Sequence, residues 1–348
     1  MVSQSMHIIF YNKKVRDALE QISLLSTNPL ILFVVDEKGK LLGSLTDGDI
    51  RKGLLLGITL DDDVTVLMNK DFKYLQNPDD YERFNALRQL NLKIIPLLDD
   101  KFQIVDLLDF QKIKAILPVD AVIMAGGKGV RLKPYTDDTP KPMLKVGDKP
   151  IIAHNIDRLI EYGIKNIYIS VNYLKDQLIN FITETYSDCL NIDFIEENQP
   201  LGTIGSVRLA SSFKHDDILV MNSDILTNID FFDFYKSYKE TEAKMSVSTF
   251  GVRINLPYGI LNTEGETVQS LVEKPSFTYY SNAGIYLINK AMLTYIPENK
   301  AYDATDLLEC LIENKQKVSH FLIRGYWLDI GNMQNYAKAQ EDIKFIKF

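Results

Sequence analysis

Strands and helices alternate along the sequence after Pro118, and this alternation restricts the chain to a small group of folds. Short runs rich in apolar residues predict strands at 121–124, 166–171, 192–195 and 218–221, and the segments between them predict helices at 151–162, 173–186 and 205–212. Such alternation is typical of an α/β fold with a mainly parallel, Rossmann-like sheet. Ligands of these sheets bind beyond the carboxyl ends of the strands, so we expect functional residues just after strands.

The residues before Pro118 contain a shorter pattern that occurs twice. Each copy predicts a helix, a strand, a turn and a second strand, and the copies start near residues 15 and 81. A repeated order of elements at a period of roughly 60 residues indicates an internal repeat. With a length of 348 residues, the chain is predicted to have two domains, 1–117 and 118–348.

The first copy contains VVDEKGKLLGSLTDGDIRK at 34–52, which resembles a CBS motif. CBS modules form pairs and bind adenosyl nucleotides, so the resemblance implies a small α/β CBS pair whose Thr46 and Asp49 contact a nucleotide effector. In the second copy we match Leu108 to Thr46 and Gln111 to Asp49, which leaves at most one half-site intact. The alternative is a pair that serves only self-association, with Thr46 and Asp49 capping a helix. Both alternatives imply a homo-oligomer.

Composition excludes several functional classes. The net charge is −8, whereas a nucleic-acid binder needs clustered Lys and Arg. No apolar run is long enough for a membrane span, and the N-terminal residues lack the apolar core of a signal peptide. Cys189 and Cys310 form no ligand cluster and are expected to be reduced. We therefore expect a cytoplasmic protein without a membrane or nucleic-acid partner.

The segment AVIMAGGKGVRLKPYTDDTPKPML at 121–144 carries the strongest functional signal. An apolar strand leads into Gly126, Gly127 and Gly129, and Pro140 and Pro142 flank Lys141. The segment contains no GxxxxGK[ST] P-loop, and Leu132 stands where a dinucleotide-binding GxGxxG motif has its third glycine. Glycines after a strand allow backbone N–H groups to approach phosphates, so we expect a phosphate site of another kind.

This segment resembles the signature GGxGxRLxP…PKP of the sugar nucleotidyltransferases, which join a nucleoside triphosphate to a sugar 1-phosphate and release pyrophosphate. Five further motifs of that family follow in order: LGT at 201–203, Ser-Asp at 223–224, EKP at 273–275, NAGIY at 282–286 and WLDIG at 327–331. The resemblance covers roughly residues 119–348 and implies an enzyme that makes a nucleoside diphosphate sugar for surface glycans.

Phosphoryl-group chemistry explains the charged residues of these motifs. The sugar phosphate must attack an α-phosphorus surrounded by negative oxygens, so positioning and charge neutralisation dominate catalysis. The forked donors of Arg131 suit the departing pyrophosphate, and Lys141 supplies a point charge for the α-phosphate. By resemblance, Asp224 and Asp329 share a Mg²⁺ ion, which accepts one or two carboxylates plus phosphate oxygens. Asp224 as a helix cap and Asp329 as a turn residue are the structural alternatives.

The resemblance also assigns the base and sugar contacts. Glu197, five residues before Gly202, meets the edge of the base, and Gly202 and Thr203 adjoin its face. Because a carboxylate only accepts hydrogen bonds, Glu197 favours guanine, with its adjacent N1–H and N2–H donors, and hence GTP. Four further residues are expected on the sugar side, and they are Gly259, Glu273, Lys274 and Asn282. The identity of the sugar stays open.

Two other functions remain open at this stage. The first is a sensor that binds nucleotide or sugar without turnover and is read out through the CBS pair. The second is a phosphocholine-type cytidylyltransferase on the same fold, for which Tyr279 and Tyr280 could contribute to an aromatic cage. The intact set of Arg131, Lys141 and the two carboxylates favours an active sugar transferase.

Overall fold

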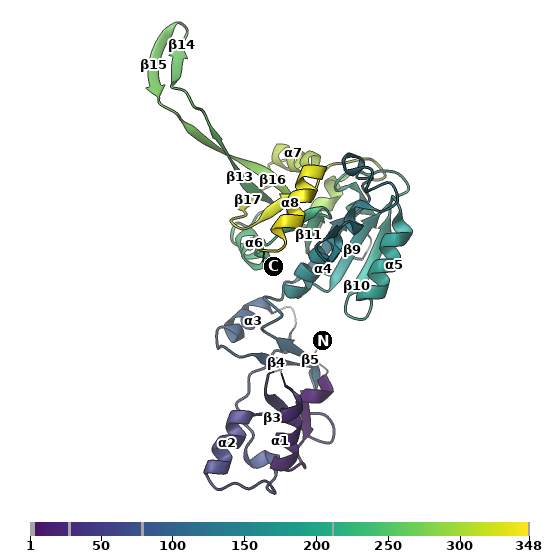
Figure 1. Ribbon diagram of the computed structural model, residues 1–348, viewed down its shortest axis with the longest axis vertical. Helices are drawn as coiled ribbons and strands as arrows, with labels where there is room; N and C mark the ends of the chain where they lie inside the picture. The colour runs from purple at the N-terminus through teal and green to yellow at the C-terminus, as the bar shows by residue number, and fades with distance from the viewer. Residues whose placement is uncertain (1–3, 27–28, 78–79, 211, 347–348) are drawn as a thin grey trace. The chain divides into compact units, whose positions relative to one another are not determined.

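The computed structural model describes residues 4–26, 29–77, 80–210 and 212–346. The chain divides into two compact units, residues 1–116 and 117–348, and each is described here by itself (Figure 1). This division falls one residue before the boundary expected from the sequence. No helix in the described ranges is long and apolar enough to cross a membrane.

The first unit begins with a three-stranded sheet and two helices. Strand β1 runs parallel to β2, and β2 runs antiparallel to β3. The helices pack their apolar sides on this sheet and form one core. The elements are η1 (Gln4–His7), β1 (Ile8–Phe10), α1 (Val15–Leu24), β2 (Ile31–Val35), β3 (Leu41–Thr46), α2 (Asp47–Leu55) and η2 (Val64–Val66).

The second repeat is smaller and has its own core around Phe84 and Phe110. It consists of α3 (Tyr81–Arg88), β4 (Ile94–Leu98) and β5 (Ile104–Asp109). Cross-strand pairing joins Ile31 to Thr46 in the first repeat and Ile94 to Asp109 in the second. The repeats therefore align without a gap, and our sequence alignment was wrong by one residue: Asp109 corresponds to Thr46, and Lys112 corresponds to Asp49. Residues 110–118 form no helix equivalent to α2.

The second unit is built on a seven-stranded sheet in the order β10-β9-β6-β11-β16-β13-β17. Its first four strands are mutually parallel, as predicted, while β16 runs antiparallel to both of its neighbours. The expected α/β class with a mainly parallel sheet is confirmed. The strands are β6 (Val119–Met124), β9 (Asn166–Val171), β10 (Asn191–Glu196), β11 (Asp217–Asn222), β13 (Met245–Asn255), β16 (Ser276–Asn289) and β17 (Val318–Leu322).

Both faces of the sheet are covered. In β11, Val220 faces a core that includes Leu307 and Leu311 of α7, and its neighbours Leu219 and Met221 are also buried. Burial of successive residues is the mark of a strand between two layers. The helices are α4 (Ile151–Glu161), α5 (Lys175–Tyr186), α6 (Phe231–Glu240), α7 (Ala304–Glu313) and α8 (Met333–Asp342). Short 3₁₀ helices are η3 (Val130–Leu132), η4 (Lys141–Met143), η5 (Gly205–Leu209) and η6 (Lys290–Tyr295).

Two details differ from the expected order of elements. The helix expected over 205–212 is only the short η5, and residue 211 lies outside the described residues. Three pairs of short strands also accompany the main sheet, namely β7 (Lys145–Val146) with β8 (Lys149–Pro150), β12 (Ile225–Thr227) with β18 (Trp327–Asp329), and β14 (Ile260–Glu264) with β15 (Thr267–Val272).

Strands β13 and β16 continue past the sheet as a two-stranded ribbon, which ends in the β14–β15 hairpin (Figure 1). We call residues 250–281 the arm. The arm was not predicted from the sequence, because the motifs in this stretch mark single positions and not paired strands. A signal was present, since Val252 and Ile254 alternate with Arg253 and Asn255 in the pattern of a half-covered strand.

Candidate functional site

The glycine-rich segment leaves the buried strand β6 and turns sharply at Gly129. Gly129 has φ +62°, in the left-handed region, and a Cβ atom there would lie 2.9 Å from Lys141 Cβ and 3.0 Å from Thr136 Cγ2. A side chain would thus strain the backbone and displace Lys141. Gly127 differs, because a Cβ atom built there meets nothing within 4 Å. Its surroundings leave space for a ligand to approach the backbone.

Lys141 is held at the start of η4 by the turn at Pro140, whose φ is −60°. Its Nζ forms an ion pair with Asp224 Oδ2, and the two side chains are only 12% and 21% exposed. The close approach that Gly129 permits thus sets the base of the Lys141 side chain, and Asp224 fixes its tip. The sequence motif PKP therefore delivers a partly buried cation next to a carboxylate.

Strand pairing brings the two predicted metal carboxylates together across about a hundred residues of sequence. Ile225 of β12 pairs with Asp329 of β18, and Ile330 N donates to Asp224 O at 2.9 Å. A Cβ atom at Gly331 would lie 3.1 Å from Asp329 Oδ1 and 3.2 Å from Arg131 Nη2, so the carboxylate and the guanidinium both lie beside this glycine. Burial and the nearby Asp224 carboxylate raise the pKa of Asp329, although Lys141 and Arg131 oppose the shift.

The chemistry of these donors fits a hard divalent cation. Asp329 Oδ1 is buried and has no hydrogen-bond partner within the described residues, so an acceptor is left for a cation to use. Those residues contain no group of three or more Asp, Glu, His or Cys side chains that could hold a metal ion by themselves. Two carboxylates with phosphate oxygens to complete the shell are the ligand set that Mg²⁺ usually accepts.

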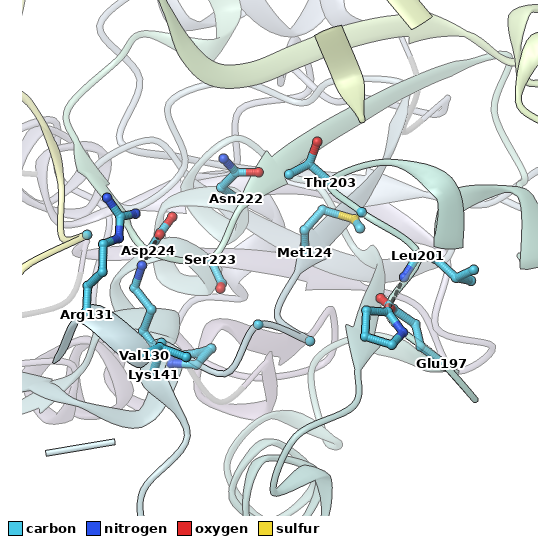
Figure 2. Close-up of a pocket in the computed structure, with 17 residues that line it drawn as sticks. Met124, Val130, Arg131, Lys141, Glu197, Leu201, Thr203, Asn222, Ser223 and Asp224 are labelled. Atoms are coloured by element: carbon cyan, nitrogen blue, oxygen red, sulfur yellow. Dashed lines mark hydrogen bonds and ion pairs between the residues drawn. The ribbon is translucent and has the colours of Figure 1, made fainter. Parts of the chain in front are cut away.

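Arg131, Lys141 and Asp224 line a pocket of about 400 Å³ at the carboxyl ends of β6 and β11, while Asp329 does not line it but lies beside Gly331, which does. Figure 2 shows its two ends: Arg131, Lys141 and Asp224 lie together at one end, and Glu197 and Leu201 lie at the other. Most of the predicted nucleotide-side residues line it, and these are Gly126, Gly127, Gly129, Arg131, Lys141, Glu197, Gly202, Thr203 and Asp224. The pocket therefore has charged side chains at the end where phosphates are expected, and the carboxylate of Glu197, a hydrogen-bond acceptor, at the opposite end.

Glu197 is anchored by the protein at both carboxylate oxygens. Ser170 Oγ donates to Oε1, and Leu201 N donates to Oε2 at 3.0 Å. Gly126 allows this position, because a Cβ atom there would lie 3.1 Å from Oε1. Each oxygen keeps a second lone pair. Ser170 is in turn bonded by Ser206 at 3.0 Å, a support that the sequence motifs did not indicate.

The LGT loop is fixed by the segment that leads into α7. Thr203 donates from its N and from its Oγ1 to Asp303 Oδ1, at 2.9 and 3.1 Å. Gly202 has φ +77°, and a Cβ atom there would lie 2.6 Å from Tyr302 O. The protein's own packing therefore requires the glycine, whether or not a base stacks on it. Sequence reasoning missed Asp303 because no motif includes it.

The predicted sugar contacts are not gathered in this pocket. Gly259, Glu273 and Lys274 lie exposed on the arm, and none of them lines the pocket. Gly259 faces Glu273 itself, since a Cβ atom there would lie 2.8 Å from Glu273 Oε2. Lys274 has φ +44°, in the left-handed region. Their role in sugar binding stays a prediction.

Asn282, the fourth predicted sugar contact, stands at the base of the arm. Its Nδ2 donates to Tyr286 Oη at 2.9 Å, and its Oδ1 accepts from Gly284 N at 2.9 Å. It lines a second cavity of about 520 Å³ with Thr249, Tyr280 and His320. The side chain thus fixes the local strand geometry, and its contact with a sugar also stays a prediction.

Asn222 lines the pocket and was not singled out from the sequence. It is the last residue of β11, directly before the Ser-Asp motif. Gly284, with φ +74°, makes room for it, because a Cβ atom at Gly284 would lie 2.8 Å from Asn222 Nδ2. Its position after a buried strand was the available signal.

In the first unit, Thr46 and Asp49 bond to each other. Thr46 Oγ1 donates to Asp49 Oδ2 at 2.6 Å, and the backbone N–H groups of both residues bond reciprocally to the other side chain. This is a capping box at the start of α2. In the second repeat, Asp109 accepts from Gln111 N at 2.9 Å. Thr46 and Asp49 therefore cap α2, as the structural alternative stated, and their role in binding a nucleotide effector stays a prediction.

Comparison with known proteins agrees with this site. The model of the nucleotidyl transferase family matches residues 120–345. A mannose-1-phosphate guanyltransferase of Schizosaccharomyces pombe is 31% identical over 226 residues, and a probable mannose-1-phosphate guanylyltransferase 1 of Oryza sativa subsp. japonica is 32% identical over 225. Each match covers 62% of this chain and 62% of the relative, so the chain spans about three fifths of the length of these curated relatives.

A solved structure of HddC from Yersinia pseudotuberculosis is 30% identical, with a TM-score of 0.52, and covers 65% of this chain and 99% of that one. The same protein has also been solved in complex with GMP-PN, with a TM-score of 0.51. The match of the family model spans well over half of the sequence and includes every motif of the pocket. This chain therefore belongs to the nucleotidyl transferase family.

Proposed function

We propose that this protein transfers a guanylyl group from GTP to a sugar 1-phosphate, releasing pyrophosphate and forming a GDP-sugar for glycan assembly. One observation carries the proposal: Arg131 and Lys141 stand beside Asp224 at one end of a pocket whose other end holds the acceptor Glu197. A triphosphate and its base require this separation of charge. The names of the guanylyltransferase relatives and the GMP-PN complex of HddC support the choice of nucleotide.

In the proposed reaction an oxygen of the sugar phosphate attacks the α-phosphorus of GTP. A new bond forms between that oxygen and the α-phosphorus, and the bond from the α-phosphorus to the oxygen that bridges to the β-phosphorus breaks. Negative charge grows on the departing pyrophosphate, which the guanidinium of Arg131 can bind through two parallel hydrogen bonds. Lys141 neutralises the α-phosphate, and its 12% exposure strengthens that interaction relative to one in water.

Asp224 and Asp329 would hold Mg²⁺ in this scheme. When bound, the ion would supply Lewis-acid neutralisation of the phosphate charge. The unpartnered Oδ1 of Asp329 is the observation that supports the assignment. Lys141 pairs with Asp224, so the lysine and the cation would share this carboxylate.

Glu197 would read the base. Its oxygens already accept from Ser170 and from Leu201 N, which orients the carboxylate while leaving one lone pair on each oxygen. Two acceptors side by side complement the N1–H and N2–H donors of guanine. Uracil and thymine offer one such donor flanked by acceptors and would face the carboxylate unfavourably.

The two alternative functions have weaker support. A sensor without turnover has no need for both carboxylates beside Lys141. A choline-type cage needs aromatic rings on one side of a site, but Tyr279 pairs across the arm with Val252 and Tyr280 with Gly251, so these adjacent tyrosines point to opposite faces of the ribbon.

The test is pyrophosphate release from four nucleoside triphosphates, each with mannose 1-phosphate, an amino-sugar 1-phosphate, a heptose 1-phosphate and phosphocholine. We expect release with GTP and one sugar phosphate and no release with phosphocholine. Turnover of CTP with phosphocholine would replace the proposal with the cytidylyltransferase. Nucleotide binding without turnover under every pairing would replace it with the sensor.

A further inference from the structure

The carboxylate of Glu197 is held at both oxygens by groups from different parts of the fold. Glu197 follows β10 directly, Ser170 belongs to β9, and Leu201 begins the LGT loop. Ser170 Oγ donates to Oε1, and Leu201 N, shown in Figure 2, donates to Oε2 at 3.0 Å. Two anchored oxygens fix the plane of a carboxylate, whereas a single anchor leaves it free to turn. The direction in which Glu197 faces a ligand therefore depends on what holds these two donors.

Behind Ser170 lies a second buried serine, Ser206. Both residues are 0% exposed, and Ser206 Oγ donates to Ser170 Oγ at 3.0 Å. Because a carboxylate only accepts hydrogen bonds, Ser170 must give its single hydroxyl hydrogen to Glu197 and accept from Ser206. The direction of donation is thus fixed from Ser206 through Ser170 to Glu197, and we call this chain the serine relay. Successive hydrogen bonds in a buried chain polarise and strengthen each other.

The segment that leads into α7 holds the second donor. Tyr302 N donates to Leu201 O at 3.0 Å, on the same residue whose N–H group binds Glu197. Tyr302 O accepts in turn from Ile204 N at 3.2 Å and from Gly205 N at 3.1 Å. The LGT loop is therefore bonded to Tyr302 at both of its ends, and a shift of Leu201 N would have to break these bonds.

Asp303, the next residue, completes this attachment. Its Oδ1 accepts from Thr203 N at 2.9 Å and from Thr203 Oγ1 at 3.1 Å. Thr203 Oγ1 accepts in return from Ala304 N, the first residue of α7, at 2.9 Å. Thr203 therefore caps α7 from a distant part of the chain, in the way that an N-cap residue caps its own helix. The LGT loop and the start of α7 hold each other in place.

We propose that Ser170, Ser206 and Asp303 are positioning residues that set the choice of nucleobase through Glu197. The inference rests on the proposed function, because it takes Glu197 as the reader of the base. Guanine presents two adjacent donors and needs both carboxylate oxygens, whereas uracil presents a single donor and needs one. A carboxylate that has lost an anchor turns more freely, so its contact with guanine weakens more than its contact with uracil. Loss of any of the three residues therefore lowers the preference for GTP.

The first experiment removes the hydroxyl groups of the serine relay. We expect Ser170→Ala to lower the ratio of kcat/KM for GTP to that for UTP about fivefold, and Ser206→Ala, one bond further away, about twofold. The change should be mainly a higher KM for GTP, with kcat within about twofold. Ser248→Ala is the matched control, because Ser248 is also 0% exposed in a strand and does not line the pocket. Equal ratios in Ser170→Ala and Ser248→Ala would overturn the proposal. Ser206→Ala keeps the test open if Ser170→Ala folds poorly.

The second experiment separates the position of the LGT loop from the stability of α7. Asp303→Ala removes the acceptor for Thr203, and we expect the same ratio to fall about fivefold. Asp303→Asn keeps Oδ1 as an acceptor, so we expect a ratio within about twofold of the wild type. Asp230→Ala controls for the loss of a helix cap, because Asp230 accepts from Phe232 N and Asp233 N at the start of α6. A fall in Asp303→Asn or in Asp230→Ala as large as that in Asp303→Ala would overturn the proposal.

The third experiment combines Ser170→Ala and Asp303→Ala, one at a time, with Glu197→Gln. Because both residues act through the carboxylate, neither should change the ratio by more than about twofold once the carboxylate is gone. A further fall as large as in the wild-type background would show that they act elsewhere and would overturn the proposal. An unchanged ratio in Glu197→Gln itself would instead refute Glu197 as the base reader of the proposed function. A ratio that falls in Glu197→Gln but not in Ser170→Ala or Asp303→Ala would refute this inference alone.

Discussion

The nucleotide pocket and the arm belong to one folded unit, and both carry residues that the sequence motifs singled out, yet they differ in how those residues are held. In the pocket Lys141 is fixed by Asp224, and Glu197 is fixed by Ser170 and by Leu201 N. On the arm Glu273 and Lys274 are exposed. A motif therefore indicates which residues are functional, whereas the pairing of the strands determines which of them lie close together.

The strongest test of this difference is removal of one pocket carboxylate. We expect Asp224→Asn and Asp329→Asn each to lower kcat/KM for pyrophosphate release at least 100-fold, a loss of about 2.7 kcal/mol of transition-state stabilisation. Asp137→Asn is the matched control, since Asp137 is exposed and its carboxylate pairs with Lys133 in the same loop. More than a tenth of the wild-type activity in either pocket variant would contradict its role as a metal ligand.

Alanine substitutions at Gly129 and Gly127 distinguish a glycine required by packing from a glycine required for a ligand to approach the backbone. Gly129→Ala must adopt a positive φ and push Lys141, so we expect a loss of about 1 kcal/mol of stability and a 10- to 100-fold loss of activity. Gly127→Ala has open space around its Cβ, so we expect activity to fall while the melting temperature is unchanged. Thermal melts and pyrophosphate release measure both. An unchanged activity in Gly127→Ala would show that no ligand approaches that residue.

Glu197→Gln tests the acceptor end of the pocket. The amide can keep both protein contacts, because its oxygen accepts from Leu201 N and Ser170 Oγ can accept from its NH₂ group. We therefore expect a normal fold and a roughly tenfold fall in the ratio of kcat/KM for GTP to that for UTP. The measurement is steady-state kinetics with both nucleotides, and an unchanged ratio would remove Glu197 as the base reader.

On the arm we expect a smaller and more selective effect. Lys274→Met should raise KM for the sugar 1-phosphate about fivefold and leave KM for GTP within twofold, because neither Lys274 nor Glu273 lines the nucleotide pocket. Glu266→Gln at the tip of the arm is the control. If both substitutions leave the sugar kinetics unchanged, the predicted sugar contact of Lys274 is wrong.

The smallest effect on chemistry is expected from removal of the first unit. Residues 117–348 form a compact unit that contains the whole pocket, so we expect turnover within twofold of the full chain. AMP, ADP or ATP should change the rate of the full chain only, if Thr46 and Asp49 bind an effector. Kinetics and light scattering on both proteins provide the comparison. Equal nucleotide responses would remove the predicted sensor role, and unchanged light scattering would remove the predicted association through the first unit.

The parallel sheet and the glycine-rich side of the pocket could be predicted from the sequence, because both depend on patterns of neighbouring residues. The run Ala121 to Met124 is apolar on both sides, which specifies a strand covered on two faces, and the glycines directly after it specify where a ligand can approach. The meeting of Asp224 with Asp329 was expected only by resemblance, since it depends on the pairing of β12 with β18.

The rest depended on contacts that no local pattern encodes. Asp303 holds Thr203 across one hundred residues, and no motif links them. The equivalence of Asp109 with Thr46 follows from the cross-strand register. From the sequence alone, the two repeats can be aligned with a shift of one residue, because apolar residues occupy most strand positions in both. The arm escaped prediction because its strands were read as separate motifs.

The stack of Phe250 on Trp327 has a practical consequence. Trp327 is the single tryptophan of the chain, its Nε1 donates to Ala283 O at 2.9 Å, and it stands two residues before Asp329. Its indole therefore touches the base of the arm, and its strand β18 also carries Asp329. Intrinsic fluorescence of this one residue can report events on both sides without any label. Quenching or a shift in the emission of Trp327 on addition of Mg²⁺ or of nucleotide would report a change near β18.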